Sequence, residues 1–129
     1  MRNLMIAALA ALSMGAISAS AATVTVTSID GTWGNVQGAT ATGTGTSSIS
    51  WGEPASDDGQ SSYSFDASAT PIVNPGSPFL LGDFTHNNFP IFAPSITGAD
   101  LTVTVSGNID GNAFSLGGVY RFGHFETPN

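Results

Sequence analysis

The 129-residue chain has no cysteine and no lysine, and its only arginines are Arg2 and Arg121. Without cysteine no disulfide supports the fold, so strand pairing and packing must stabilise it. Nine acidic residues give a formal net charge of −7. This shortage of cations argues against nucleic acid as a partner and against anionic lipid surfaces, and the acidity favours solubility outside the cell.

The first 21 residues have the three-part pattern of a secretory signal peptide. Arg2 gives a basic start, residues 4–17 form an apolar run, and Ala19-Ser20-Ala21 is an A-x-A cleavage site. No later segment approaches about 18 consecutive apolar residues, the length that a spanning helix needs. We therefore expect a signal peptide over 1–21 and a single mature domain over 22–129 that has no membrane span.

The mature part shows the alternation of strands and no helical periodicity. Residues 23–28, 48–51, 61–65 and 101–106 alternate apolar and polar side chains, as half-buried strands do. Ile29-Asp30-Gly31 predicts a turn before a second strand at 32–36. The low-complexity segment 38–47 is either a weak strand or a mobile loop, and we expect a loop at 53–60 and a proline-rich connector at 71–78.

The clearest hairpin lies near the C-terminus. Asp110-Gly111 is a strong turn signal between strands at 101–106 and 113–122, and Gly117-Gly118 predicts a bulge or bend in the second strand. Short strands separated by frequent turns predict an all-β fold, an antiparallel β-sandwich or jelly-roll-like domain. Because residues 126–129 follow directly after the last predicted strand, we expect the domain to be truncated at its C-terminus.

The densest stretch of chemistry is Phe84-Thr85-His86-Asn87-Asn88-Phe89-Pro90-Ile91. Residues 79–91 resemble the core motif of the THxN family of PEP-CTERM proteins, which overlap with the choice-of-anchor K domain proteins of bacterial surfaces. Thr85, His86 and Asn88 occupy the Thr, His and Asn of the motif. The resemblance implies export to the surface of an exopolysaccharide-producing Gram-negative bacterium, although the C-terminal sorting tail of the family is absent from this sequence.

Two interpretations of this stretch stay open. In the first, its polar side chains bond to the backbone of an irregular loop that Phe84 and Phe89 anchor in the core. In the second, Thr85, His86 and Asn88 contact a ligand. Trp51 and Tyr63 are the matching candidates for stacking on a sugar, although single aromatic residues on short strands, Trp33 and Tyr120 included, more often belong to the core.

Calcium is the one cofactor that the sequence suggests. Asp57, Asp58, Asn108 and Asp110 supply the oxygen ligands that Ca²⁺ prefers, but neither segment matches an EF-hand, and ordinary turns explain the same residues. No G-x-S-x-G or H-E-x-x-H motif is present. A hydrolase would require an acid, base or nucleophile within about 3 Å of His86.

We therefore expect a non-enzymatic domain, secreted or at the cell surface, that is associated with the exopolysaccharide matrix. The expected partners are extracellular polysaccharide or other surface proteins. The alternative is a carbohydrate- or calcium-binding module, and exposure of the candidate side chains distinguishes the two.

Overall fold

The computed structural model describes residues 20–126, which contain β-strands and no helix. Four strands form sheet A in the order β10-β9-β1-β6, four form sheet B in the order β2-β3-β5-β7, and β4 pairs with β8. The strands are β1 (Val24–Gln37), β2 (Ala41–Thr42), β3 (Ser48–Trp51), β4 (Glu53–Pro54), β5 (Ser61–Ala67), β6 (Ile72–Val73), β7 (Gly82–Asn87), β8 (Ile91–Phe92), β9 (Gly98–Ile109) and β10 (Asn112–Gly123). All the pairings are antiparallel, so the predicted all-β, sandwich-like fold is confirmed.

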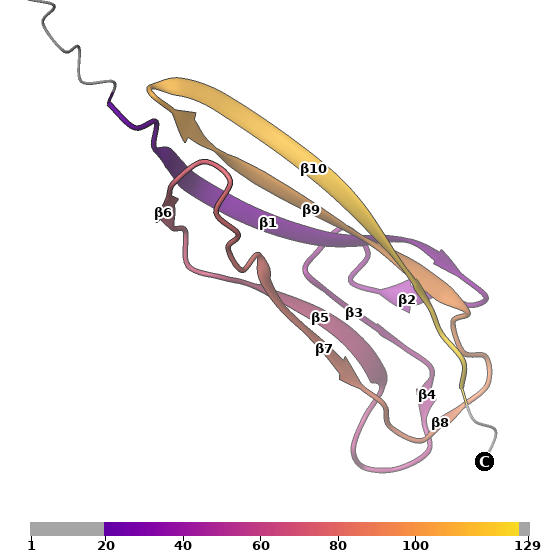
Figure 1. Ribbon diagram of the computed structural model, residues 1–129. Coiled ribbons are helices and arrows are strands. Elements are labelled where there is room, and N and C mark those ends of the chain that lie inside the picture. Colours follow the sequence, from indigo (N-terminus) through magenta and orange to yellow (C-terminus); the bar gives the residue numbers. More distant parts are fainter. Residues whose placement is uncertain (1–19, 127–129) are drawn as a thin grey trace, which may run out of the picture.

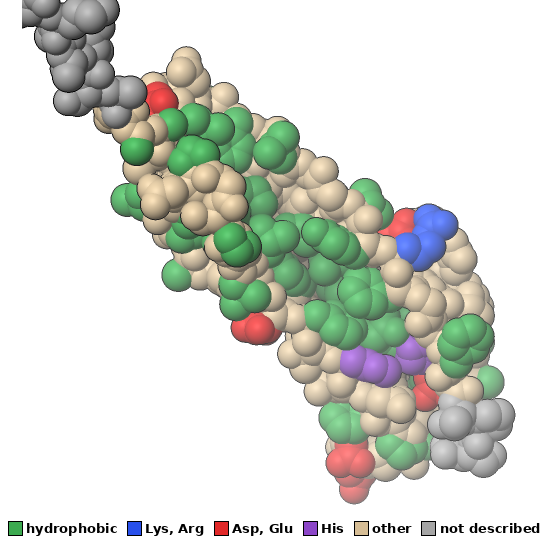
Figure 2. Space-filling view, viewed as in Figure 1, with side chains coloured by type: hydrophobic (Ala, Val, Ile, Leu, Met, Phe, Trp, Pro, Cys, Tyr) green, Lys and Arg blue, Asp and Glu red, His purple; other side chains and the backbone are tan. Residues whose placement is uncertain are grey.

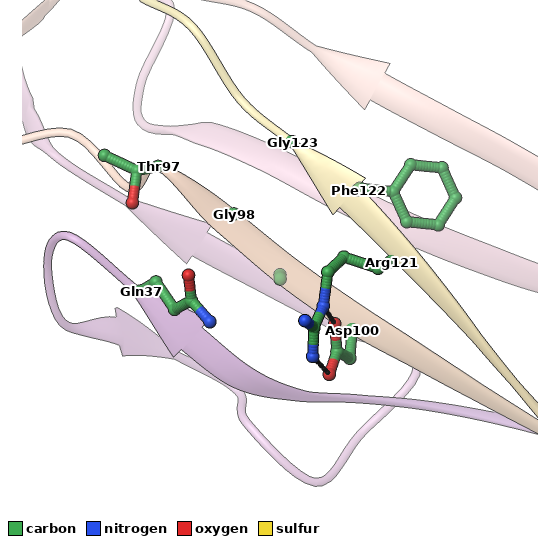
Figure 3. Close-up of a pocket in the computed structure, with 8 residues that line it drawn as sticks. Gln37, Thr97, Gly98, Asp100, Arg121, Phe122 and Gly123 are labelled. Atoms are coloured by element: carbon green, nitrogen blue, oxygen red, sulfur yellow. Dashed lines mark hydrogen bonds and ion pairs between the residues drawn. The ribbon is translucent and has the colours of Figure 1, made fainter.

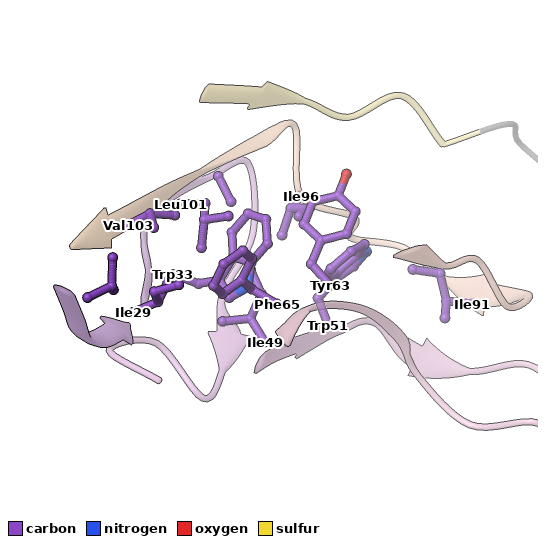
Figure 4. Packing of buried hydrophobic residues seen from close by; sticks show 12 residues of the cluster. Ile29, Trp33, Ile49, Trp51, Tyr63, Phe65, Ile91, Ile96, Leu101 and Val103 are labelled. Carbon is purple, nitrogen blue, oxygen red and sulfur yellow. The ribbon is translucent and has the colours of Figure 1, made fainter. Parts of the chain in front are cut away.

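The two sheets pack face to face around one core. The long strands β1, β9 and β10 run along the molecule, and β3, β5 and β7 lie across from them (Figure 1). Figure 4 shows the buried side chains of the two sheets meeting in this space. Sheet A contributes Val26, Ile29, Trp33, Ala99, Leu101 and Val103, sheet B contributes Ile49, Trp51, Tyr63 and Phe65, and β8 and the following segment add Ile91 and Ile96.

The turn predicted at Asp30-Gly31 is wrong, because β1 continues through both residues. Gly31 is a strand residue that makes room for the ring of Phe65: a Cβ there would lie 2.7 Å from Cε1, 2.9 Å from Cγ and closer still to Cδ1. Gly82 in β7 has the same role, because its Cβ would lie 2.5 Å from Cζ of Phe65. Gly31 of sheet A and Gly82 of sheet B therefore both lie against the ring of Phe65.

The hairpin near the C-terminus is confirmed as β9 and β10. Its turn residues Asp110 and Gly111 have φ angles of 49° and 83°, the left-handed conformation of a type I′ turn. The bulge predicted at Gly117-Gly118 is wrong, because the register with β9 is unbroken from Asn112 to Gly123. The register shifts lie in β1 instead, after Val26 and after Gly34.

Two segments predicted as loops contain short strands: the loop at 53–60 begins with β4, and the connector at 71–78 includes β6. Segment 38–47, expected as a weak strand or a mobile loop, contains the two-residue strand β2 between turns. No helix in residues 20–126 is long and apolar enough to cross a membrane. The predicted signal peptide lies outside the described residues except for its last two positions.

Candidate functional site at the open side of the sandwich

The sandwich is open on the side where β7 and β10 form the edges of the two sheets. A groove of about 200 Å³ lies there. Its lining is apolar: Phe65, Leu81, Gly82, Phe84, Leu101, Val103, Tyr120 and Phe122. Figure 2 shows hydrophobic side chains gathered along this side with both histidines at one end. These lining residues together with His86 are called the open side below.

Strand register places the aromatic side chains of the open side. Phe84 and His86 lie directly opposite Phe65 and Tyr63, so their side chains share the inner face of sheet B. The ring of Phe84 stacks on that of Phe122 in β10, with centroids 4.7 Å apart and an interplanar angle of 25°. Because no further strand covers this side among the described residues, Phe84 stays 42% and Tyr120 49% exposed.

A hydrogen-bonded chain of side chains lies at the histidine end of the open side. The Tyr63 hydroxyl is 2.8 Å from His124 Nδ1, and His124 Nε2 is 2.7 Å from Glu126 Oε2, which also accepts from Ser95 Oγ at 3.0 Å. A carboxylate only accepts, so Nε2 carries a proton and, in the neutral ring, Nδ1 accepts from Tyr63. Both nitrogens of this 5% exposed ring are therefore engaged, which gives His124 a structural role.

His86 lies against this chain without joining it. Its ring centroid is 4.9 Å from that of Tyr63 and 5.3 Å from that of His124. Burial lowers the pKa of His86, the nearby His124 lowers it further, and Glu126 opposes this shift. Burial also raises the pKa of Tyr63, with a smaller effect from Glu126. A neutral imidazole of this kind offers one donor and one acceptor to a ligand.

The ring of His86 has no hydrogen-bonded acid, base or nucleophile among residues 20–126. Within residues 20–126 its ring nitrogens make no hydrogen bond, and neither do the side chains of Thr85 and Asn88. The irregular loop of the first interpretation is wrong for residues 82–87, which form the regular edge strand β7, whereas residues 88–90 do lie outside the strands. Of the polar side chains here, Asn87 bonds to the side chain of Ser62. Thr85, His86 and Asn88 are exposed, so their side chains do not fix the loop backbone.

Trp51 and Tyr63 are core residues and form no exposed sugar-stacking surface, as the preference for core placement predicted. Trp51 is 1% and Tyr63 3% exposed, and Trp33 is also buried. The indole N–H of Trp33 donates to the Ser47 carbonyl at 3.2 Å, whereas the buried indole N–H of Trp51 has no partner in the described structure. Of the four aromatic residues considered, only Tyr120 is exposed.

Three of the four calcium candidates, Asp57, Asp58 and Asp110, lie in turns, and Asn108 lies in strand β9. Ser56 Oγ donates to Asp58 at 2.9 Å, and Asp110 accepts from the backbone N–H of Thr23 at 3.3 Å. Asp110 also occupies the hairpin turn itself. Residues 20–126 contain no group of three or more His, Asp or Glu side chains placed to hold a metal ion.

A smaller pocket on the other face of sheet A is closed to anions by an ion pair. Figure 3 shows Arg121 and Asp100 facing each other beside Gln37. Arg121 Nε and Nη2 lie 2.9 and 3.0 Å from the two Asp100 oxygens, and Asn35 Nδ2 donates to Asp100 at 2.8 Å. Arg121 and then Asn35 hold the pKa of Asp100 at about 2. The guanidinium is therefore already paired.

Sequence reasoning missed three of the four members of the hydrogen-bonded chain, Ser95, His124 and Glu126, and named Tyr63 only as a residue for stacking on a sugar. Tyr63 and His124 are 61 positions apart, and Ser95 and Glu126 are 31 apart, so no local motif joins them. The only signal was the presence of a second histidine in a chain with two. The hydrogen bond between Tyr63 and His124 depends on the fold, which brings β5 next to the segment after β10.

The fold and the site define an all-β antiparallel sandwich with an aromatic groove at its open side. No protein-family model, curated protein or solved structure matches this chain. The resemblance of residues 79–91 to the THxN family therefore stays a prediction from the sequence.

Proposed function

We propose that this chain is an exported, non-enzymatic domain of a Gram-negative cell surface that binds exopolysaccharide at its open side. The observation that carries the proposal is the exposed groove in which Phe84 stacks on Phe122 beside Tyr120. A sugar ring has an apolar C–H face and a polar hydroxyl rim. Aromatic rings with a few polar groups beside them fit both parts.

The polar groups stand at one end of the same surface. His86 presents a ring without a hydrogen-bonding partner in the described residues, and Thr85 and Asn88 are exposed next to it. These groups supply donors and acceptors for hydroxyls, while the hydrogen-bonded chain through His124 holds the adjoining core in place. The acidity of the chain fits a neutral polymer better than a polyanion.

The test is retardation of the secreted chain in a native gel that contains exopolysaccharide purified from the producing bacterium. We expect the native chain to be retarded and Phe84→Thr to lose most of this effect. Phe92→Thr is the matched control, because Phe92 is also exposed but lies on β8, outside the groove lining. Equal retardation of the two variants, or none for the native chain, would refute the proposal.

Two further measurements test the other parts of the proposal. N-terminal sequencing of the secreted protein should give Ala22 as its first residue. A protein that stays in the cytoplasm with residues 1–21 still attached would contradict export. Incubation with the polysaccharide should leave its chain length unchanged. A falling chain length would show that the domain is an enzyme.

A further inference from the structure

Among residues 20–126, strand β10 is the longest free edge of the two sheets. It pairs with β9 through all twelve of its residues on one side only, whereas the other edge strands β2, β6 and β7 have two, two and six residues. Natural proteins usually keep edges short or protect them with charges, proline or bulges. β10 has no proline and no bulge, and its only charged residue, Arg121, is paired with Asp100.

The inner face of β10 is apolar and partly uncovered. Leu116 lies opposite Val105 and Tyr120 opposite Leu101, so both share the face that β9 turns to the core. Leu116 is nevertheless 67% and Tyr120 49% exposed. The pattern is symmetric: Leu116 and Tyr120 stand two positions from Gly118, and Phe114 and Phe122 stand four positions from it.

The symmetric apolar pattern favours a second copy of this chain as the partner, and charge places the contact at β10. Residues 22–129 contain one arginine and nine acidic residues, a formal charge of 1 − 9 = −8, so two copies repel each other over most of their surfaces. β10 contains no carboxylate. Two copies that meet there bring together their longest apolar edges without opposing carboxylates.

We propose that two copies pair antiparallel through β10, with Gly118 opposite the partner's Gly118 on a two-fold axis. In this register Leu116 lies opposite the partner's Tyr120, and Phe114 opposite the partner's Phe122. Each pair occurs twice, and cross-strand pairs of aromatic and aliphatic side chains stabilise sheets. Sheet A becomes continuous across the two copies, and the isologous contact closes at a dimer.

Sedimentation velocity of the secreted chain over a concentration series tests the pairing, and the native chain should sediment as a dimer. Gly118→Asp places two carboxylates directly opposite each other, and we expect association to weaken by about tenfold or more. A Cβ at Gly118 would meet only the Tyr120 ring of its own strand, at 3.8 Å or more, so the monomer accepts the substitution. Gly118→Asn has the same size without the charge and should stay dimeric. A native monomer, or equal association of both variants, would overturn the proposal.

Cysteine variants test the register. The native chain has no cysteine, so a disulfide in a single-cysteine variant joins two copies. Gly118→Cys should cross-link readily. Leu116→Cys should not, because four residues of strand separate it from its symmetry mate by roughly 14 Å, beyond the ~7 Å limit for a disulfide. Equal cross-linking of the two variants would contradict the register.

The dimer goes beyond polysaccharide binding and is tested separately from it. Phe84 lies on β7 and makes no pair with the partner copy, whereas Tyr120 and Phe122 belong both to the groove lining and to the proposed contact. We therefore expect Phe84→Thr to lose polysaccharide binding and to remain dimeric. A dimer that binds no polysaccharide would leave the pairing intact and refute only the proposed function.

Discussion

The close approach of Gly31 to the Phe65 ring makes Gly31→Ala the sharpest test of the core. The new methyl group would overlap three ring carbons, and a Cβ built at Gly82 on β7 would also lie 2.5 Å from Cζ of the same ring. The ring is 5% exposed and packs at the centre of the sandwich. The overlap is relieved only if the ring or β1 moves, and either movement disturbs this packing.

The expected magnitude follows from the overlap. Inserting one methyl group into a well-packed core costs about 1–3 kcal/mol. The lower entropy of the unfolded chain offsets about 0.4–1 kcal/mol of this. We therefore expect a net loss of about 1–2 kcal/mol in the free energy of unfolding, or a fall in Tm of roughly 4–16 °C for a domain of this size.

Urea unfolding followed by the fluorescence of the buried Trp33 and Trp51 measures this loss. Gly34→Ala is the matched control, because Gly34 lies three residues further along β1 and a Cβ there has nothing within 4 Å. In Gly31→Ala, a second change of Phe65→Leu should recover part of the loss, since the smaller side chain removes the overlap. Equal stability of Gly31→Ala and Gly34→Ala would refute the packing described for Phe65.

Two further predictions concern the buried indoles and His86. Trp33→Phe should destabilise the fold by about 1 kcal/mol more than Trp51→Phe, because Trp33 donates to Ser47 whereas Trp51 leaves its N–H unpaired; equal losses in urea unfolding would contradict this. The pKa of His86 is lowered in the folded state, so the unfolded state binds more protons below about pH 7. The free energy of unfolding should fall as the pH drops through 6.5 and the folded-state pKa, and His86→Gln should reduce this dependence; an unchanged pH profile in the variant would show that His86 does not cause it.

Local patterns predicted the parts of the fold that depend on neighbouring residues. Asp110-Gly111 marked the hairpin because both residues adopt left-handed φ angles there. The same dipeptide at Asp30-Gly31 led to a wrong turn prediction, because Gly31 lies within β1 and makes room for the Phe65 ring of the opposite sheet. A tertiary contact of this kind leaves no trace in the spacing of residues along β1.

The candidate site was predicted in part. The segment around Phe84 and His86 does lie at the edge of the groove, but as a regular strand whose polar side chains point to solvent or to the opening. Trp51 and Tyr63 are instead buried beneath it. Their depth depends on how the two sheets stack, which alternation within one strand does not specify.

Titration of the isotope-labelled chain with exopolysaccharide fragments, followed by amide and aromatic NMR shifts, tests the central claim most directly. Binding at the open side should shift the resonances of Phe84, His86, Tyr120 and Phe122 together, in a saturable way. The hairpin turn at Asp110-Gly111, at the opposite end of β10 from His124 (Figure 1), should stay unchanged. Shifts confined to that turn, or no saturable shift at the open side, would contradict the account.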